Sequence, residues 1–550
     1  MEAPAPPLTP APPARPRPLL AAFLLATVSG CMSAAEYRDE ADDEVYSIVR
    51  ELRNGLAGGD SFTIESSGST LRQRLLDGET LDGPMDLVTA LEVASENSRT
   101  YQTRRETLFL TALDLTLARF DFSVQETGVF GSILDGRANR QDTASGSGVL
   151  GISKIFTTGL AVVGDLALNL VRDISRGDAW DATTNLRLGI TQPILRGFGR
   201  SIVREPLTQS ERNVVYQART YDRFRHTFAF EVASRYYRIL ALMDVLENER
   251  QNQKRREELR ERNEAFAEAG LLDDIQVDQA SQNELAARNS VIQAERNLAS
   301  LLDDYKLFLG LPIDTNLTLD PTDRPTLETY PALDVEFQED AVISVALSSR
   351  LDYLNDLDAV VDTIRRARIA ADSLRAGLDV NLDVNFSSET NKPFTYDRDS
   401  FSSILRLDLD TPLQRVVERN VYRQRLIELD RAERSAVETA DSIRTELRDS
   451  LRNLNVARRS YEIQENAVVL AQRRVDSAQL KLEAGRASTR DLLESQDDLV
   501  QAQNGAANAR TDYILAGLAL YVDMELILVD GEGIQIDTEP LLSKLASQQP

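Results

Sequence analysis

The chain has 550 residues and a formal net charge of −26, with one cysteine, one histidine and one tryptophan. Such an acidic balance disfavours nucleic acid as a partner, because phosphate binding requires a basic surface. A zinc site built from Cys and His is excluded by the count, and a histidine-based catalytic dyad would rest on His226 alone. Long stretches free of Gly and Pro indicate extended helices rather than several compact cores.

The N-terminus has the pattern of an export signal over residues 1–30. Arg15 and Arg17 precede an apolar run, Leu19–Val28, which is too short to span a bilayer as a helix. Small residues then lead to Cys31, which resembles the lipidated cysteine of a bacterial lipoprotein. The alternative is an ordinary signal peptide with an incidental cysteine. Residues 31–83 are polar and are expected to form a periplasmic extension of low order, with a short helical stretch around Asp42–Leu52.

A helix is predicted from Pro84 to about Arg119, since proline is well placed in a first helical turn. Four segments of alternating apolar and polar residues predict strands near 120–130, 184–192, 378–387 and 402–411. The run Gly151–Leu170, inside the segment 131–183, is a candidate for an extra hairpin. A half-buried strand of a soluble protein also alternates, but an aspartate-lined face opposite an apolar one favours water on one side and lipid on the other.

Each pair of strands ends in a proline, Pro193 or Pro412, where we expect the transition from barrel to helix. A very long helix follows; the second runs over Arg415–Glu483 without Gly or Pro. It is expected to stop at Gly485, a residue suited to a left-handed C-terminus, and to restart after Ser488. In the first half, Gly270 and Asp273 occupy the corresponding positions. The chain thus consists of two helix–strand–strand–helix repeats, 84–320 and 321–525, and a C-terminal tail, 526–550.

The number of predicted strands points to an assembly. Four strands cannot close a membrane barrel, since known barrels begin at eight, and open edges in lipid leave unsatisfied backbone groups. Three copies of the chain would supply 12 strands and 12 long helices. The fold class expected is therefore mainly α with a small β part, completed by other copies.

The duplicated unit, the strand exit Ile190–Gly199, and the tip Leu482–Gly485 followed by Asp491–Gln496 resemble the TolC family of outer-membrane efflux proteins. The resemblance covers about residues 84–525. It implies a homotrimer with a 12-stranded outer-membrane barrel in lipid, continued by a 12-helix periplasmic coiled-coil tunnel. It also implies a periplasmic adaptor protein and an inner-membrane pump as partners, no cofactor, and a lipid anchor of the kind proposed at Cys31.

The resemblance further assigns roles to the two hairpin tips. Asp491 and Glu494 are three apart and share a helix face, which in the family carries the acidic ring at the periplasmic aperture. The alternative for such a pair is a solvated helical face. In the first hairpin, Gln276 stands where many relatives have an acidic residue, with Asp278 nearby, and both are possible gate partners. The turn residues expected to contact the adaptor are Gly270, Leu271, Leu272, Gly485, Arg486 and Ala487.

Two other classes of protein compete with the channel. A lipid-anchored periplasmic coiled-coil scaffold explains the long helices but not four strands with one polar and one apolar face. An enzyme is disfavoured because the chain has no phosphate-binding loop, nucleophile elbow or metal cluster in its sequence. Within the channel class, the sequence leaves the cargo open between drugs, metal ions and secreted proteins.

Overall fold

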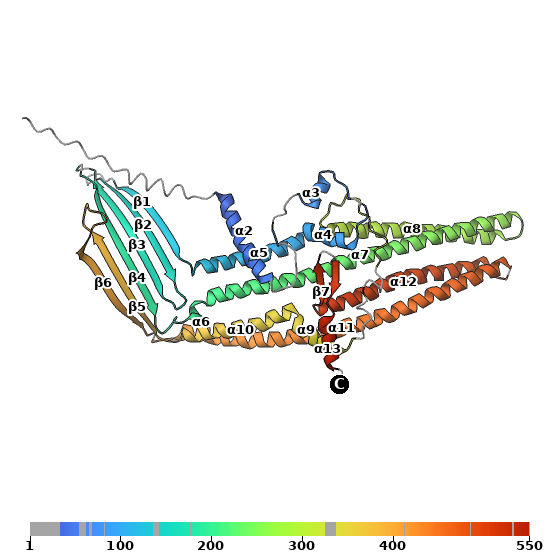
Figure 1. The fold of residues 1–550 in the computed structure, drawn as a ribbon. Coiled ribbons are helices and arrows are strands. Elements are labelled where there is room, and N and C mark those ends of the chain that lie inside the picture. Colours follow the sequence, from blue (N-terminus) through green and yellow to red (C-terminus); the bar gives the residue numbers. More distant parts are fainter. Residues whose placement is uncertain are drawn as a thin grey trace, which may run out of the picture.

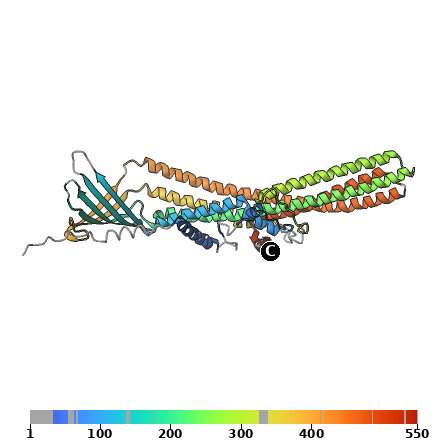
Figure 2. The same cartoon turned by 90° about the horizontal axis from the view of Figure 1, so that it is seen from above.

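The computed structural model describes residues 33–53, 62–64, 69–81, 83–135, 142–174, 176, 178–324, 330, 337–411, 413–484, 486–530 and 533–548. The expected signal peptide, Cys31, Pro412 and Gly485 lie outside these residues. The molecule is elongated: a β-sheet lies at one end and two helical hairpins end at the other (Figures 1 and 2).

The sheet has six antiparallel strands in the order β1-β2-β3-β4-β5-β6. They are β1 Gln125–Asp135, β2 Thr143–Ile155, β3 Ala161–Asp173, β4 Asp181–Pro193, β5 Gly377–Ser388 and β6 Tyr396–Asp410. The last three match predicted strands. The prediction of four strands is wrong, because the candidate hairpin around Gly151–Leu170 is β2–β3 and is hydrogen-bonded into the sheet on both sides. The first repeat is therefore helix–four strands–helix.

The first predicted strand was placed too early. Phe120 is the last residue of a helix and Phe122 lies in a turn, where its ring packs against the helical core. The strand itself begins at Gln125. The alternation of Phe120, Phe122 and Val124 at the end of a helix therefore has the pattern of a strand without forming one.

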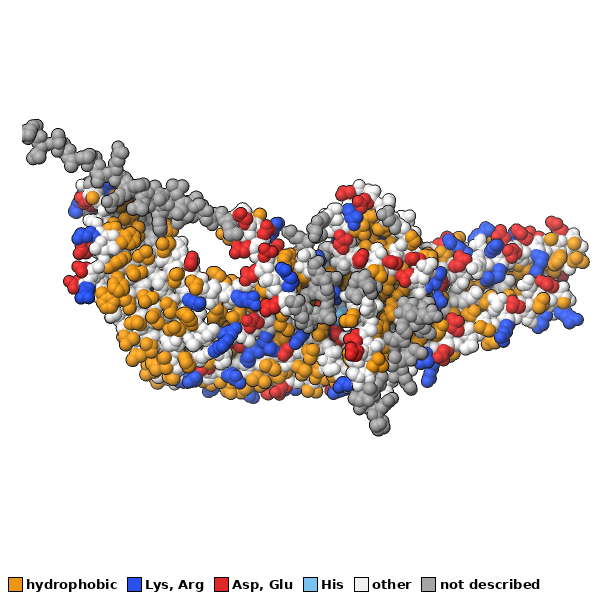
Figure 3. Space-filling model, in the orientation of Figure 1, with side chains coloured by type: hydrophobic (Ala, Val, Ile, Leu, Met, Phe, Trp, Pro, Cys, Tyr) orange, Lys and Arg blue, Asp and Glu red, His pale blue; other side chains and the backbone are white. Residues whose placement is uncertain are grey.

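The two faces of the sheet differ in polarity. Leu186 lies opposite Phe386, and Leu188 lies opposite Val384, so apolar side chains gather on one face. The other face carries polar contacts between neighbouring strands: Arg187 Nη2 to Asp383 Oδ1 at 2.9 Å, Thr191 Oγ1 to Asn381 Oδ1 at 2.7 Å, and Asn381 Nδ2 to Asp408 Oδ2 at 2.7 Å. Figure 3 shows hydrophobic side chains covering much of the sheet, whereas the helical part is studded with charges.

The helices form one curved layer that extends away from one end of the sheet (Figure 1). Its elements are α4 Leu87–Asn97, α5 Arg99–Phe120, α6 Arg200–Val203, α7 Glu205–Glu268, α8 Asp274–Leu309, α9 Glu339–Ser349, α10 Leu351–Asp372, α11 Val416–Glu483 and α12 Thr489–Asp523. Near the sheet the packing order is α5–α7–α10–α11, and near the tips it is α8–α7–α12–α11. The long helix predicted over Arg415–Glu483 is confirmed as α11, whose 68 residues extend about 100 Å at 1.5 Å per residue.

A coiled-coil seam joins α11 to its neighbours, as the heptad-like spacing of its apolar residues predicts. Ile443, Leu447 and Leu454 are buried in the main core, and Tyr461 stacks on Tyr513 of α12 with ring centroids 6.0 Å apart. Among the described residues, no helix combines the length and apolar character needed to cross a membrane.

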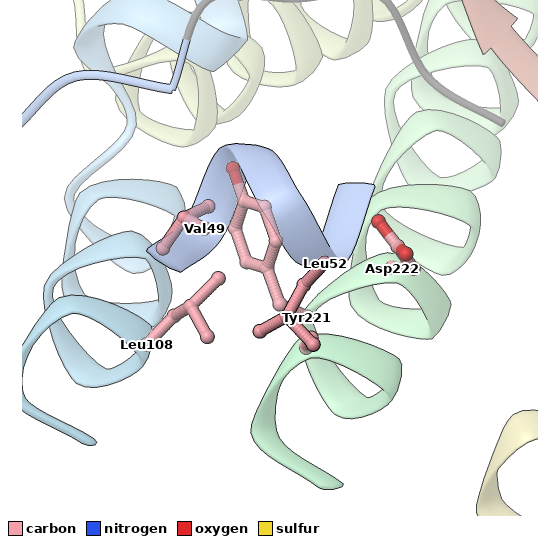
Figure 4. A pocket seen from close by; sticks show the side chains of 6 residues that line it. Val49, Leu52, Leu108, Tyr221 and Asp222 are labelled. Atoms are coloured by element: carbon pink, nitrogen blue, oxygen red, sulfur yellow. The ribbon is translucent and has the colours of Figure 1, made fainter. Parts of the chain in front are cut away.

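In the described parts of residues 31–83 and 526–550 the chain forms regular elements, and the helical stretch expected around Asp42–Leu52 lies within a longer helix. Residues in the predicted low-order extension form α2, Ala34–Arg53, and the short α3, Leu71–Leu76. Val49 and Leu52 of α2 line a small pocket with Leu108 of α5 and Tyr221 of α7 (Figure 4). Within the expected tail, β7 Ile527–Asp530, β8 Gly533–Ile536 and α13 Glu539–Gln548 are formed, and they bury apolar side chains against the same core.

Candidate functional site: the hairpin tips

The first tip turns as its glycine predicts. Gly270 has a φ of +72°, in the left-handed region that residues with a Cβ rarely adopt. The amide of Leu271 donates to the Phe266 carbonyl at 2.8 Å, which closes the end of α7. Asp273 is the N-cap residue of α8, as expected. Leu271 is 74% exposed, so the tip presents an apolar side chain to its surroundings.

The second tip is held by a capping box at the start of α12. The Ser488 side chain accepts a hydrogen bond from the Asp491 amide at 3.3 Å, and the Asp491 carboxylate accepts from the Ser488 amide and hydroxyl, each at 2.8 Å. These hydrogen bonds lower the pKa of Asp491 below its ordinary value. Asp491 thus serves the local fold as well as remaining exposed, while Arg486 is exposed beside it.

Glu494 faces a different partner. Its Oε1 lies 3.5 Å from Nη2 of Arg474 on α11, and the same guanidinium contacts Asp498. All three side chains are more than 40% exposed, so solvent screens these ion pairs. The structure therefore places a mixed cluster, with one arginine and two carboxylates, where sequence analysis predicted an acidic pair.

Gln276 contacts the second hairpin, although not through the predicted acidic residues. Thr489 Oγ1 donates to Gln276 Oε1 at 3.1 Å and lies 3.3 Å from Nδ2 of Asn263, which donates to it. Thr489 and Asn263 are buried, at 1% and 2% exposure. Asp278 is exposed. A polar bridge thus joins the two hairpins of one chain immediately above their tips.

A second bridge lies farther from the tips and again joins α7 and α8 to α12. Arg256 on α7 is 2% exposed, and its Nη2 lies 2.5 Å from Asp497 Oδ1 on α12, while Nη1 donates to Asn283 of α8 at 3.0 Å. Burial lowers the pKa of Arg256, against the opposing effect of Asp497. Sequence analysis missed Arg256, Asn263 and Thr489, because no local pattern distinguishes them from the many polar residues of these helices.

At the other end of the helices, Pro193 is the last residue of β4 and lies opposite Asp379. Beyond it the Ile194 amide donates to the Leu378 carbonyl at 2.8 Å, and Arg196 pairs with Asp410 at 2.7 Å. Proline suits the end of a strand because it has no amide hydrogen to donate to a ladder. Pro193 thus ends β4 shortly before the chain enters α6 and α7.

Comparison with known proteins shows similarity in structure only. No family model and no curated protein sequence matches the chain. Among solved structures, the outer-membrane channel OprN is similar with a TM-score of 0.60 and 12% identity, over 83% of this chain and 92% of that one. The Campylobacter jejuni outer-membrane channel CmeC has a TM-score of 0.57 and 13% identity, over 90% and 94%. The open state of the Neisseria gonorrhoeae outer-membrane channel MtrE has a TM-score of 0.52 and 13% identity, over 85% and 97%.

The chain therefore has the fold of the outer-membrane channels of the TolC family, as the resemblance in sequence implied. The similarity extends over most of both chains, because 83–90% of this chain and 92–97% of each similar chain are matched. These neighbours are outer-membrane channels, the class that the sequence analysis favoured over an enzyme.

Proposed function

We propose that the chain forms the outer-membrane exit duct of a tripartite efflux or type I secretion system, as a homotrimer that passes solutes from the periplasm to the exterior. The observation that carries this proposal is a single one. A sheet with one apolar and one polar face is continuous with helices about 100 Å long that end in paired hairpins. Lipid on the outside of the sheet and water on the inside account for both faces.

The hairpins would form the periplasmic gate. In a closed state the bridges Thr489–Gln276 and Arg256–Asp497 hold the two hairpins of each copy together. Opening then requires the hairpins to move relative to those of the next copy, and the existence of an open state in a channel of this fold supports such a movement. Glu494 is the better candidate for the acidic ring, because Asp491 is engaged by Ser488. A ring of carboxylates at a constriction favours cations over anions.

The partners follow from the surfaces at each end. Leu271 and Leu272 on the first tip and Arg486 and Ala487 on the second are proposed to contact the periplasmic adaptor, which in turn joins the inner-membrane pump. The exposure of Leu271 supports this role, because burying an apolar side chain against a partner protein stabilises the complex. A lipid on Cys31 would anchor the chain in the outer membrane near α2.

Conductance in planar lipid bilayers tests this function. The purified full chain is expected to remain oligomeric in detergent and to open long-lived, water-filled channels. The scaffold alternative gives the opposite result: a chain held to the membrane only by its lipid, which is monomeric in detergent and conducts nothing. Cargo is then identified by co-purification of the adaptor and pump that the duct retains.

A further inference from the structure

Because each chain contributes six strands and not four, the number of strands in the assembled barrel changes. Every neighbouring pair from β1 to β6 is joined by an antiparallel ladder, including β2 with β1 and β3 with β4; the β5–β6 ladder has a register shift between Phe386 and Ser388. The hairpin β2–β3 is therefore part of the wall and not a loop outside it. Its alternation agrees with the rest of the sheet: Leu166 and Leu168 lie on the apolar face, opposite Leu150 and Gly148, whereas Asp165 and Asn169 lie on the polar one.

The sheet has two free edges. Within the described residues, β1 and β6 each have a neighbouring strand on one side only. β1 leads away from the helices and β6 leads back to them, so β1 of one copy and β6 of another can pair antiparallel. In lipid such edges must be paired, since no water is present to accept or donate hydrogen bonds to their backbone groups. Six strands are also too few to close alone.

The helical layer is open at the same two sides. α5 and α8 lie on the β1 side, and α11 lies on the β6 side. Each edge helix carries exposed apolar residues seven apart: Leu285 and Ile292 on α8, and Val456, Ile463 and Leu470 on α11, all at least 55% exposed. Heptad stripes of this kind are coiled-coil seams that lack a partner helix. The matching occupant is the opposite edge of a second copy.

The sheet and the helical layer have equal widths. Six strands spaced about 4.8 Å apart and tilted about 40° span about 38 Å around a barrel. Four packed helices span about 32–40 Å. Copies of this chain can therefore close the barrel and the tunnel with the same circumference.

We propose that three copies of this chain close an 18-stranded barrel above a 12-helix tunnel, with β1 of each copy paired to β6 of the next and α8 packed against α11. This inference rests on the homotrimer of the proposed function. It replaces the expected barrel of 12 strands. With six strands per chain, 12 strands would come from two copies, whereas three copies supply 18. Barrel diameter grows about linearly with strand number, so the lumen is about 1.5 times as wide as that of a 12-stranded barrel.

Cysteine accessibility tests whether β2–β3 is barrel wall. Ala167→Cys and Asn169→Cys on the polar face are expected to react with a membrane-impermeant maleimide in intact outer membranes. Leu166→Cys and Leu168→Cys on the apolar face are expected to resist it and to react only after denaturation. The unsubstituted chain reports any reaction at Cys31. Equal reaction at all four positions would mean that the hairpin lies outside the membrane, which overturns the proposal.

Cross-linking counts the copies. Val129→Cys on β1 is combined in turn with the polar-face positions of β6: Ser402→Cys, Ile404→Cys, Arg406→Cys and Asp408→Cys. At least one pair is expected to give bands of two and three chains on oxidation, and none larger. As a control, Val163→Cys on the central strand β3 with Ile404→Cys gives only single chains.

The remaining outcomes are also decisive. A series that ends at two chains would establish a 12-stranded, two-copy barrel and overturn the 18-stranded one, although the channel function would stand. Absence of cross-links from every β1–β6 pair would overturn the edge pairing. Loss of conductance and membrane insertion in the unsubstituted chain would instead remove the proposed function itself.

Discussion

Arg256 and Asp497, on helices from different repeats, lie with Nη2 and Oδ1 2.5 Å apart, and the guanidinium is nearly inaccessible to solvent. This pair ties α7 to α12 and so joins the two hairpins of the chain. An arginine buried in this way needs its carboxylate partner, because an unpaired buried charge is costly.

Asp497→Ala is therefore expected to destabilise the protein by about 1–3 kcal/mol, since a buried donor loses its acceptor. The change should appear as a lower thermal unfolding temperature of the detergent-solubilised oligomer. Asp449→Ala is a matched control: its pair with Arg452 is 60–71% exposed and contributes about 0–1 kcal/mol. Equal effects of the two substitutions would show that the buried pair has no special weight.

Acid should weaken the start of α12. Because hydrogen bonds from Ser488 lower the pKa of Asp491, ionised Asp491 stabilises the folded tip at neutral pH, and this contribution is lost as the pH falls through the lowered value. Hydrogen exchange in this turn, corrected for intrinsic rates, is expected to stay protected until the pH is below the ordinary aspartate value. Asp491→Asn should remove this pH dependence.

Ser488→Ala provides the matching test of the same capping box. It is expected to raise exchange in the first turn of α12 by an amount equal to about 1 kcal/mol at neutral pH. The first turn of α8 serves as an internal reference, because its N-cap residue, Asp273, makes no side-chain capping hydrogen bond. A loss of protection shared by both turns would point to general loosening instead of the cap.

Glu494→Gln should reduce the preference of the channel for cations over anions, measured as the reversal potential across a salt gradient. The side chain keeps its size while each copy loses one carboxylate, so conductance should change less than selectivity. Glu51→Gln, on the exposed side of α2, removes the same charge far from the tips and should leave the reversal potential unchanged. Unaltered selectivity in Glu494→Gln would assign this residue to a solvated helical face.

Gly310→Ala is expected to be strongly destabilising. Gly310 has a φ of +81°, and an added Cβ would lie 2.2 Å from the Asn97 carbonyl oxygen, where backbone cannot yield. The left-handed conformation alone costs about 1–2 kcal/mol for other residues. Gly164→Ala, at a strand position with no atom within 4 Å of the added Cβ, is the control. Similar unfolding temperatures for both variants would contradict this account.

The parts predicted well from sequence are those with strong local patterns. β5 and the end of β6, Leu405–Asp410, alternate between apolar and polar residues, and α11 is free of Gly and Pro. β2 was not predicted as a strand of the sheet because glycines occupy part of its apolar face. At Gly148 the surface is supplied by Phe130 of the neighbouring strand, whose ring lies 2.8 Å from where a Cβ would be. An apolar face built by a neighbour leaves no alternation to detect.

The contacts between the two hairpins could not be predicted from local sequence patterns, for a different reason. Thr489 and Gln276 are 213 residues apart, and both lie in ordinary polar helical stretches. Their contact depends on how α8 and α12 lie relative to each other, which no spacing within either helix specifies. The tips themselves were predictable, because Gly270 acts through its left-handed backbone and Ser488 through a side-chain cap, each within one turn.

The unbroken course of α11 from the sheet to its tip also has a mechanical consequence. A stiff rod anchored at one end converts a slight tilt there into a long sweep at the other, so a small rearrangement near the sheet would displace the tips far. The same leverage acts in reverse. Contacts placed at the far end resist rotation with the greatest torque for their strength. The hydrogen bond between Thr489 of α12, the helix packed along α11, and Gln276 of α8 lies at that far end.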